Sequence, residues 1–208
     1  MCKFVIWDVD GTLLDTRAGL VAAYRYALTE LGLPDRTDAQ ICSYIGPTPQ
    51  AIFQIRFGLS AAKAQHAADV FRERYKTRDL LKATVYDGVY DVMESLRARG
   101  VKQAVATNKR QDYATEICEH FGFDKYCFPI VGADNDNKLT KADLIKQCLQ
   151  TLNVADLSSA VMIGDTDGDK AAAETVGIGF IGVNYGFGFD GVEGYADTPF
   201  EILKSAGE

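Results

Sequence analysis

The chain has 208 residues, of which 47% are apolar and 25% are charged, with a formal net charge of −7 and a pI near 4.9. This composition is typical of folded globular proteins and excludes the disordered, collagenous and fibrous classes. Nucleic acid is not expected as a partner, because binding that polyanion requires a concentrated basic surface.

The cysteines and the apolar runs indicate the compartment. Five cysteines are scattered along the chain without a CxxC pair, which favours reduced, mostly buried thiols over a disulfide framework or a zinc site. The longest apolar runs, such as residues 4–7, are far shorter than the roughly 18 residues that a membrane-spanning helix needs. Asp8 interrupts the opening apolar run, so that run is not the core of a signal peptide. We therefore expect a cytoplasmic protein with no membrane partner, and the sequence carries no signature of its oligomeric state.

The first apolar segment, residues 3–8, predicts a buried strand, and a long stretch without strand signals follows it. Because this stretch interrupts an otherwise regular alternation of strands and helices, we expect an inserted all-helical cap subdomain of residues 16–83, with two hinge strands near Thr16 and Lys82. Its helical patterns cover residues 18–31, 38–44, 50–57 and 61–78.

Beyond the cap, helical and strand patterns alternate. This alternation predicts βαβ units, and hence a Rossmann-like α/β core of residues 1–15 and 84–208, with a parallel sheet and helices on both of its faces. In chain order the expected elements are helix 89–99, strand 101–108, helix 112–121, strand 128–134, helix 141–152, strand 160–165, helix 169–176 and strand 177–184.

The cap and the core differ in charge. Residues 16–82 contain ten Lys or Arg and six Asp or Glu, a net charge of +4, which leaves −11 on the rest of the chain. A mildly basic cap and an acidic core would suit a metal-bound, anionic substrate. The alternative is that most of the basic residues at positions 72–78 form a solvated helix face.

Two acidic turns follow predicted strands. The segment WDVDGTLLD places Asp8 at the end of the first strand and Asp10 two residues later, and GDTDGD places Asp165 and Asp169 after a later strand. The carboxyl ends of strands in open parallel sheets are where ligands bind. These acids could merely cap turns, but two acidic turns at one sheet edge would repel each other strongly unless a cation neutralised them.

The ligand chemistry of these turns favours magnesium. All candidate ligands are oxygens, and neither His66 nor His120 lies near the acidic turns in the sequence, so zinc and copper are poorly supported. Magnesium takes one or two carboxylates together with water and phosphate oxygens. No segment has the spacing of a calcium-binding loop.

These motifs resemble those of the haloacid dehalogenase superfamily, in particular its phosphatase branch with a helical cap, the group around phosphoglycolate phosphatase. The resemblance spans nearly the whole chain, and the motifs occur in the family's order on alternating strands and helices. They are Asp8-Val9-Asp10-Gly11-Thr12, then Thr107 with Asn108, then Lys141, and finally Gly164-Asp165 followed by Asp169.

The resemblance implies a role for each motif. Asp8 would attack phosphorus to form an aspartyl-phosphate, and Asp10 would act as general acid and base. Thr107 and Lys141 would hold the phosphoryl oxygens. Around Mg²⁺ the family pattern places Asp8, Asp10 through its main-chain carbonyl, Asp165 and Asp169, and it assigns Gly11, Thr12, Asn108 and Gly46 to the substrate site.

Some positions depart from the family pattern or stay open. The third motif lacks its usual proline and offers two lysines; Lys141 is preferred because Thr140 is a good N-cap before it, with Lys138 as a substitute. Asp167 is either a turn residue in solvent or a ligand. Lys109 and Arg110 either contact the substrate or face solvent.

The sequence thus predicts a Mg²⁺-dependent phosphatase acting on a small phosphorylated metabolite. Phosphoglycolate is the default substrate by resemblance, with nucleotides and sugar phosphates as alternatives. The turn-rich stretch 44–49, which contains Gly46, is either a specificity loop or a plain turn between cap helices. A phosphomutase of the β-phosphoglucomutase type shares all four motifs and remains an alternative, and a non-catalytic binder of phosphate ligands is a second one.

Overall fold

The computed structural model of the chain describes residues 2–45, 47–134 and 138–207. It divides into two compact units. The core unit comprises Met1–Asp15 and Thr84–Glu208, and the helical unit comprises Thr16–Ala83.

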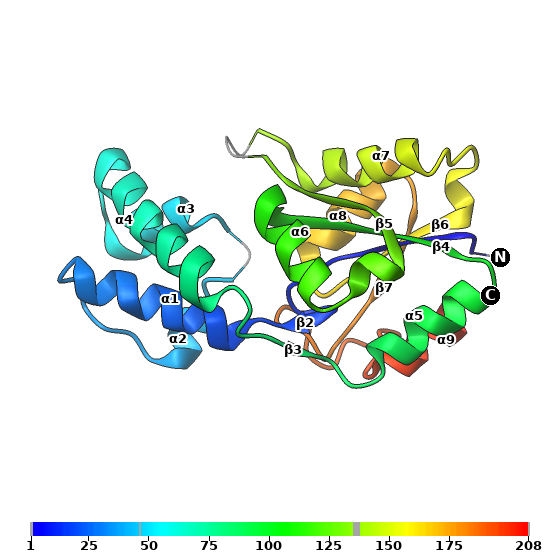
Figure 1. Ribbon diagram of the computed structural model, residues 1–208, viewed down its shortest axis with the longest axis horizontal. Coiled ribbons are helices and arrows are strands. Elements are labelled where there is room, and N and C mark those ends of the chain that lie inside the picture. The colour runs from blue at the N-terminus through cyan, green and yellow to red at the C-terminus, as the bar shows by residue number, and fades with distance from the viewer. Residues whose placement is uncertain (1, 46, 135–137, 208) are drawn as a thin grey trace. The chain divides into compact units, whose positions relative to one another are not determined.

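The core unit is built on a parallel five-stranded sheet with the strand order β5-β4-β1-β6-β7 (Figure 1). The first strand is therefore central, and Trp7 lies in register with Val105 on one side and Ile163 on the other. The five predicted strands are confirmed as β1 (Phe4–Trp7), β4 (Lys102–Arg110), β5 (Cys127–Ala133), β6 (Ala160–Gly164) and β7 (Gly179–Gly182).

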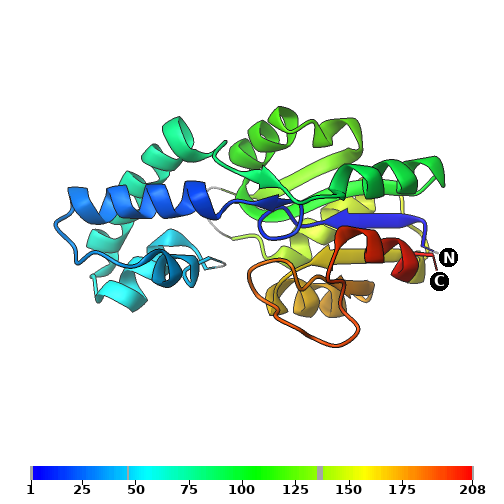
Figure 2. The ribbon, with the colours of Figure 1, turned by 90° about the horizontal axis from the view of Figure 1, so that it is seen from below.

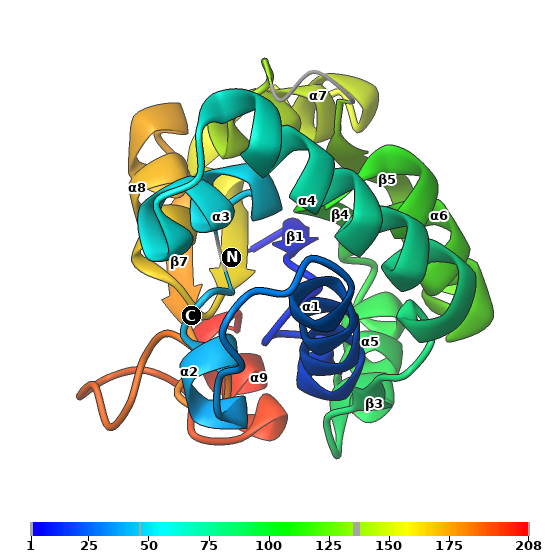
Figure 3. The same cartoon turned by 90° about the vertical axis from the view of Figure 1, so that its left-hand side faces the viewer.

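Helices cover both faces of this sheet, which confirms the predicted Rossmann-like α/β architecture (Figure 3). Two helices bury their apolar side chains against one face, around Ile6 and Met162. On the other face the indole of Trp7 donates to Gln103, whose amide donates in turn to the carbonyl of Met93. The first face carries α7 (Lys141–Thr151) and α8 (Asp167–Val176), and the second carries α5 (Val89–Ala98) and α6 (Gln111–His120), with α9 (Ile202–Ser205) beside α5.

Three smaller features complete the core unit. β2 (Leu14–Asp15) and β3 (Thr84–Val85) pair antiparallel, so the strands expected beside Thr16 and Lys82 are present. After β7 the chain makes an irregular excursion over residues 184–198 before it reaches α9 (Figure 2, orange to red). Short 3₁₀ turns lie at Phe123–Lys125, Leu157–Ser159 and Pro199–Glu201.

The helical unit has its own apolar interior, made largely of aromatic rings. The ring centroid of Tyr24 lies 4.3 Å from that of Phe71, 5.7 Å from that of Tyr44 and 5.9 Å from that of Phe53. All regular secondary structure described in this unit is helical: α1 (Arg17–Glu30), α2 (Asp38–Cys42), α3 (Pro49–Phe57), α4 (Ala61–Arg74) and the π-helical turn Tyr75–Asp79.

The prediction of one helix over residues 61–78 is wrong at its C-terminal end. The α-helix ends at Arg74, and the wider turn Tyr75–Asp79 follows, closed by a hydrogen bond from the Leu80 N–H to the Tyr75 carbonyl. This turn brings the Asp79 carbonyl against α1, where a Cβ on Gly19 would lie only 2.3 Å from it. The π turn is therefore a site of close packing that helical periodicity does not reveal.

Two further expectations concern the thiols and the membrane. All five cysteines lie in the described part of the chain and are free thiols, three of them buried. Among the helices of residues 2–45, 47–134 and 138–207, none has both the length and the apolar character needed to cross a bilayer.

Candidate active site

The site begins at the end of the central strand. Asp8 directly follows β1, is buried, and donates its N–H to the carbonyl of Ile163 at 3.0 Å. The chain then turns sharply, because the carbonyl of Val9 accepts from the N–H groups of Leu13 and Leu14. Gly11 stands in this turn at φ +79°, where a Cβ would lie 2.2 Å from an Asp165 carboxylate oxygen. Only glycine allows so close an approach of the first motif to the fourth.

Three buried carboxylates from distant parts of the sequence converge here. Oxygens of Asp8, Asp165 and Asp169 all lie within 4.8 Å of one another. Asp165 directly follows β6, and Asp169 lies in the first turn of α8, where its carboxylate accepts from both the N–H and the hydroxyl of Thr166. This capping box fixes the helix start and holds Asp169 in the cluster.

Lys141 reaches the same cluster from α7. Its Nζ lies 2.7 Å from Asp8 Oδ1 and 2.8 Å from Asp169 Oδ1. Lys141 is the first residue of a helix capped by Thr140, as expected, and its side chain is buried. Lys138, the other candidate, is exposed, and its backbone N–H donates to Asp134. The geometry therefore places Lys141, and not Lys138, among the aspartates.

The second motif lies on β4, which extends two residues beyond the predicted end. Thr107 is buried and its hydroxyl accepts from the N–H of Lys109 at 3.3 Å, whereas Asn108 is exposed. Lys109 is buried as well, and its Nζ lies 3.1 Å from Asp10 Oδ1. The alternative that Lys109 faces solvent is thus wrong. The Arg110 guanidinium is only partly exposed and pairs with Asp112 through two contacts of 3.1 Å.

The excursion after β7 supplies contacts that sequence reasoning missed. The Phe187 N–H donates to one oxygen of Asp165 at 2.7 Å, and the Thr12 hydroxyl donates to the other at 3.3 Å. The hydroxyl of Tyr185 donates to the Thr12 carbonyl at 3.2 Å. A Cβ on Gly186 would meet the Asp165 Cβ at 2.3 Å. The alternating aromatic and glycine residues of Tyr-Gly-Phe-Gly at residues 185–188 were the available signal.

Burial and mutual repulsion shape the charges of the site. Burial raises the pKa of Asp8 to about 7; Lys141 opposes the shift, and the neighbouring aspartates add to it. Burial also raises the pKa of Asp165 to about 6, against the N–H of Phe187, which lowers it. Burial alone would lower the pKa of Lys141, but the carboxylates of Asp169 and Asp8 outweigh it and hold that pKa above its usual range. The cluster therefore has more negative charge than Lys141 offsets.

This arrangement fits a hard divalent cation. Its three converging side chains offer only carboxylate oxygens, the donors that Mg²⁺ and Ca²⁺ prefer. A cation bound there would also offset the repulsion that adds to the effect of burial on the pKa values of Asp8 and Asp165.

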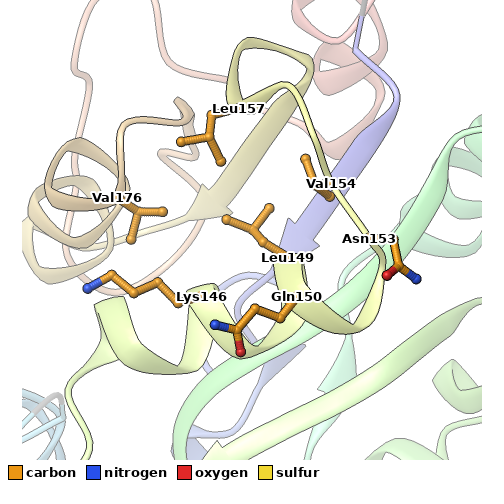
Figure 4. Close-up of a pocket in the computed structure, with 7 residues that line it drawn as sticks. All are labelled: Lys146, Leu149, Gln150, Asn153, Val154, Leu157 and Val176. Carbon is orange, nitrogen blue, oxygen red and sulfur yellow. The ribbon is translucent and has the colours of Figure 1, made fainter.

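The other predicted residues lie in different settings. Asp167 is exposed at the start of α8, and Asp10 is about one-fifth exposed. Gly46 lies outside the described residues. A separate, largely apolar pocket of about 500 Å³ opens near α7 and α8 (Figure 4). None of the predicted site residues within the described part of the chain lines this pocket. The lining residues are Lys146, Leu149, Gln150, Asn153, Val154, Leu157 and Val176.

Comparisons with known proteins find similarity in both sequence and fold. A family model described as haloacid dehalogenase-like hydrolase matches residues 5–183. A haloacid dehalogenase-like family hydrolase from Streptococcus pneumoniae superposes with a TM-score of 0.89 at 27% identity, covering 98% of both chains.

Three curated relatives also match most of the chain. A 5′-nucleotidase of Pseudomonas aeruginosa is 36% identical over 185 residues, which cover 88% of this chain and 83% of that protein. The tyrosine-protein kinase PtkA of Mycobacterium tuberculosis is 32% identical over 187 residues, 89% of this chain but only 63% of the kinase. A phosphoglycolate phosphatase of Agrobacterium fabrum is 28% identical over 211 residues, covering 98% of this chain and 86% of that protein.

Proposed function

Because the chain belongs to the haloacid dehalogenase-like hydrolase family, as its motifs indicated, we propose that it is a Mg²⁺-dependent phosphatase that cleaves small phosphomonoesters through an aspartyl-phosphate on Asp8. The observation that carries this proposal is the convergence of Asp8, Lys141, Asp165 and Asp169 at the end of the central strand. That convergence brings a nucleophile, a fixed positive charge and a set of cation ligands together.

Asp8 and Lys141 act as a pair in this proposal. A carboxylate oxygen of Asp8 attacks phosphorus, the ester oxygen departs, and the phosphoryl group stays on Asp8 until water removes it. Lys141, 2.7 Å from Asp8, fixes the orientation of this carboxylate. Its ammonium also attracts the phosphoryl oxygens, whose charge would otherwise repel a buried carboxylate.

Asp10 and Thr107 complete the reaction. Asp10 gives a proton to the leaving oxygen and later takes one from the attacking water, which its partial exposure permits. Thr107, buried at the carboxyl end of β4, holds a phosphoryl oxygen through its hydroxyl, and in this proposal Gly11, Thr12 and Asn108 belong to the substrate site.

Mg²⁺ would be held by the side chains of Asp8 and Asp165 and the main-chain carbonyl of Asp10, with Asp169 supporting it directly or through water. When bound, Mg²⁺ would supply positive charge that attracts the substrate phosphate and offsets the charge of the acidic cluster. The hydrogen bonds from Phe187 and Thr12 to Asp165 keep that carboxylate oriented toward the cluster.

The comparisons rank the substrate classes to be tested. Identity is higher with a 5′-nucleotidase, at 36%, than with a phosphoglycolate phosphatase, at 28%. Nucleoside 5′-monophosphates therefore come first, followed by phosphoglycolate and sugar phosphates.

The test is a screen of these phosphates with and without Mg²⁺, measured as release of inorganic phosphate. Wild-type protein should release phosphate only with Mg²⁺. Asp8→Asn should lose about 10³-fold or more in turnover, because it removes the nucleophile. Asp91→Asn, the same change on an exposed residue of α5, should behave as wild type.

Three results would contradict the proposal. Normal turnover by the Asp8→Asn protein would remove Asp8 as the nucleophile. Conversion of a sugar phosphate into its isomer without free phosphate would identify a phosphomutase. Binding of phosphates without any turnover would identify a non-catalytic binder.

A further inference from the structure

Lys109 is a buried lysine whose ammonium group contacts Asp10, the proposed general acid. Its side chain is only 4% exposed, and Nζ lies 3.1 Å from Asp10 Oδ1. Asp10 itself is more open, with a side chain 21% exposed. A lysine is rarely buried to this degree without an anionic partner, so the contact with Asp10 explains why the ammonium stays in the protein interior.

The backbone around Lys109 is held in place at several points. The pairing of β4 with β5 shifts register between Thr107 and Arg110, which marks a local irregularity in the strand. Within it the Lys109 N–H donates to the Thr107 hydroxyl at 3.3 Å. On β5, a Cβ on Gly132 would lie 2.7 Å from the Lys109 carbonyl, so the two strands approach closely there.

The side chain of Gln111 also holds this irregularity, through hydrogen bonds to the backbone of β5. Its carbonyl accepts from the Gly132 N–H at 2.7 Å, and its amide donates to the Ile130 carbonyl at 3.1 Å. Lys109 therefore extends from a rigid stretch of strand, and a rigid base is what a side chain needs in order to orient another one.

We propose that Lys109 is a positioning residue that holds the carboxyl group of Asp10 for proton transfer to the leaving oxygen. This inference rests on the proposed phosphatase function. The contact of Lys109 with Oδ1 fixes the orientation of the carboxyl group that carries the transferred proton. As the phosphorus–oxygen bond breaks, its electron pair stays on the leaving oxygen and takes that proton, and the ammonium of Lys109 stabilises the carboxylate that remains. Lys109 keeps its own protons throughout.

Two substrates separate this role from a structural one. An alkoxide is strongly basic and needs a proton as it leaves, so hydrolysis of a nucleoside 5′-monophosphate depends on a well-placed acid. A nitrophenolate is weakly basic and leaves without a proton. Disturbing Asp10 should therefore slow the alkyl phosphate much more than p-nitrophenyl phosphate, whereas general damage to the site should slow both equally.

The experiment measures kcat/KM for both substrates, with Mg²⁺, in wild type, Lys109→Met, Asp10→Asn and the double variant. Lys109→Met should lose about tenfold or more on the alkyl phosphate relative to the aryl phosphate, and Asp10→Asn should show the same selective loss. The double variant should lose no more than Asp10→Asn alone, because Lys109 acts through Asp10. Lys109→Arg should retain part of the selectivity.

Two further variants control for charge and folding. Lys102→Met makes the same change on an exposed lysine at the other end of β4 and should leave both substrates unaffected. Lys109→Gln, which keeps a polar end, takes the place of Lys109→Met if circular dichroism shows that the methionine variant is unfolded.

The outcomes distinguish this inference from the proposed function. Equal losses on both substrates, or losses that add in the double variant, would overturn the positioning role while leaving the phosphatase intact. Wild-type protein that hydrolyses neither substrate would overturn the proposed function, and the positioning role with it, since no acid would then need to be placed.

Discussion

The fourth motif tolerates almost no added volume around Asp165. Two segments approach this one carboxylate: the turn that contains Gly11 and Thr12, whose hydroxyl donates to it, and the backbone of Phe187. Gly186, next to Phe187, is packed almost as tightly as Gly11. A Cβ added there would lie 2.3 Å from the Asp165 Cβ and 2.4 Å from the Gly11 carbonyl oxygen. Backbone atoms cannot yield as a flexible side chain can.

Gly186→Ala is therefore expected to destabilise the protein by about 1–3 kcal/mol, since the added methyl group forces backbone shifts. The matched control is Gly168→Ala in α8, where a Cβ would have no neighbour closer than 3.5 Å. That variant should be as stable as wild type or up to about 1 kcal/mol more stable. Urea denaturation followed by circular dichroism measures both. Equal stability of the two variants would show that residues 184–198 accommodate the added methyl group without any loss of unfolding free energy.

The elements of this chain differ in how far sequence predicts them. The five strands were predictable because each is a short run of buried apolar residues, and the four aspartates of the site follow from their positions after β1 and β6. The contact of Lys109 with Asp10 depends on a register shift between β4 and β5, and pairing of that kind has no local sequence pattern. Phe187 reaches Asp165 only through tertiary folding of a loop without periodicity.

The π turn at Tyr75–Asp79 also has no local sequence pattern. It is accompanied by a buried charge network formed with residues before and after it. Asp79 is completely buried, with Oδ2 2.7 Å from Arg74 Nε and Oδ1 2.7 Å from Lys82 Nζ. These contacts tie the end of α4 to the last residues of the helical unit. The side chains of Arg74 and Lys82 are partly exposed, so the network links the buried Asp79 carboxylate to the surface.

Asp79→Ala should destabilise the helical unit by about 1–3 kcal/mol, because it leaves the turn without the acceptor that joins Arg74 and Lys82. Asp69→Ala is the matched control: Asp69 lies on α4, is more than half exposed, and contacts Arg72 and Gln65 at the surface. Its loss should cost within about 0.5 kcal/mol. Urea denaturation reports both values, and a harmless Asp79→Ala would mean that the network contributes no stability.

For the molecule as a whole, the acidic site is a source of instability when no cation is bound. Three buried carboxylates within 4.8 Å of one another repel, and Lys141 offsets only part of that charge. A cation that binds the folded chain and not the unfolded one stabilises it by mass action.

Mg²⁺ should therefore raise the melting temperature of the wild-type protein, by an amount that corresponds to about 2.7 kcal/mol when the metal is at 100 times its Kd. Asp165→Asn should abolish most of this increase, because it removes one charged ligand, whereas Asp91→Asn should keep it. Differential scanning calorimetry at constant ionic strength makes the measurement. An equal response of the Asp165→Asn protein would place the stabilising cation elsewhere.

The central place of β1 has a consequence for the order in which the polypeptide acquires structure during translation. Its register partners begin at Lys102 and Ala160, so the earliest strand to leave the ribosome waits through most of synthesis for the neighbours that complete its hydrogen bonds. Residues 16–83, whose contacts are mutual, emerge before either partner. During that interval the nascent chain exposes an apolar strand without its pairing partners, and this is when it is most vulnerable to aggregation.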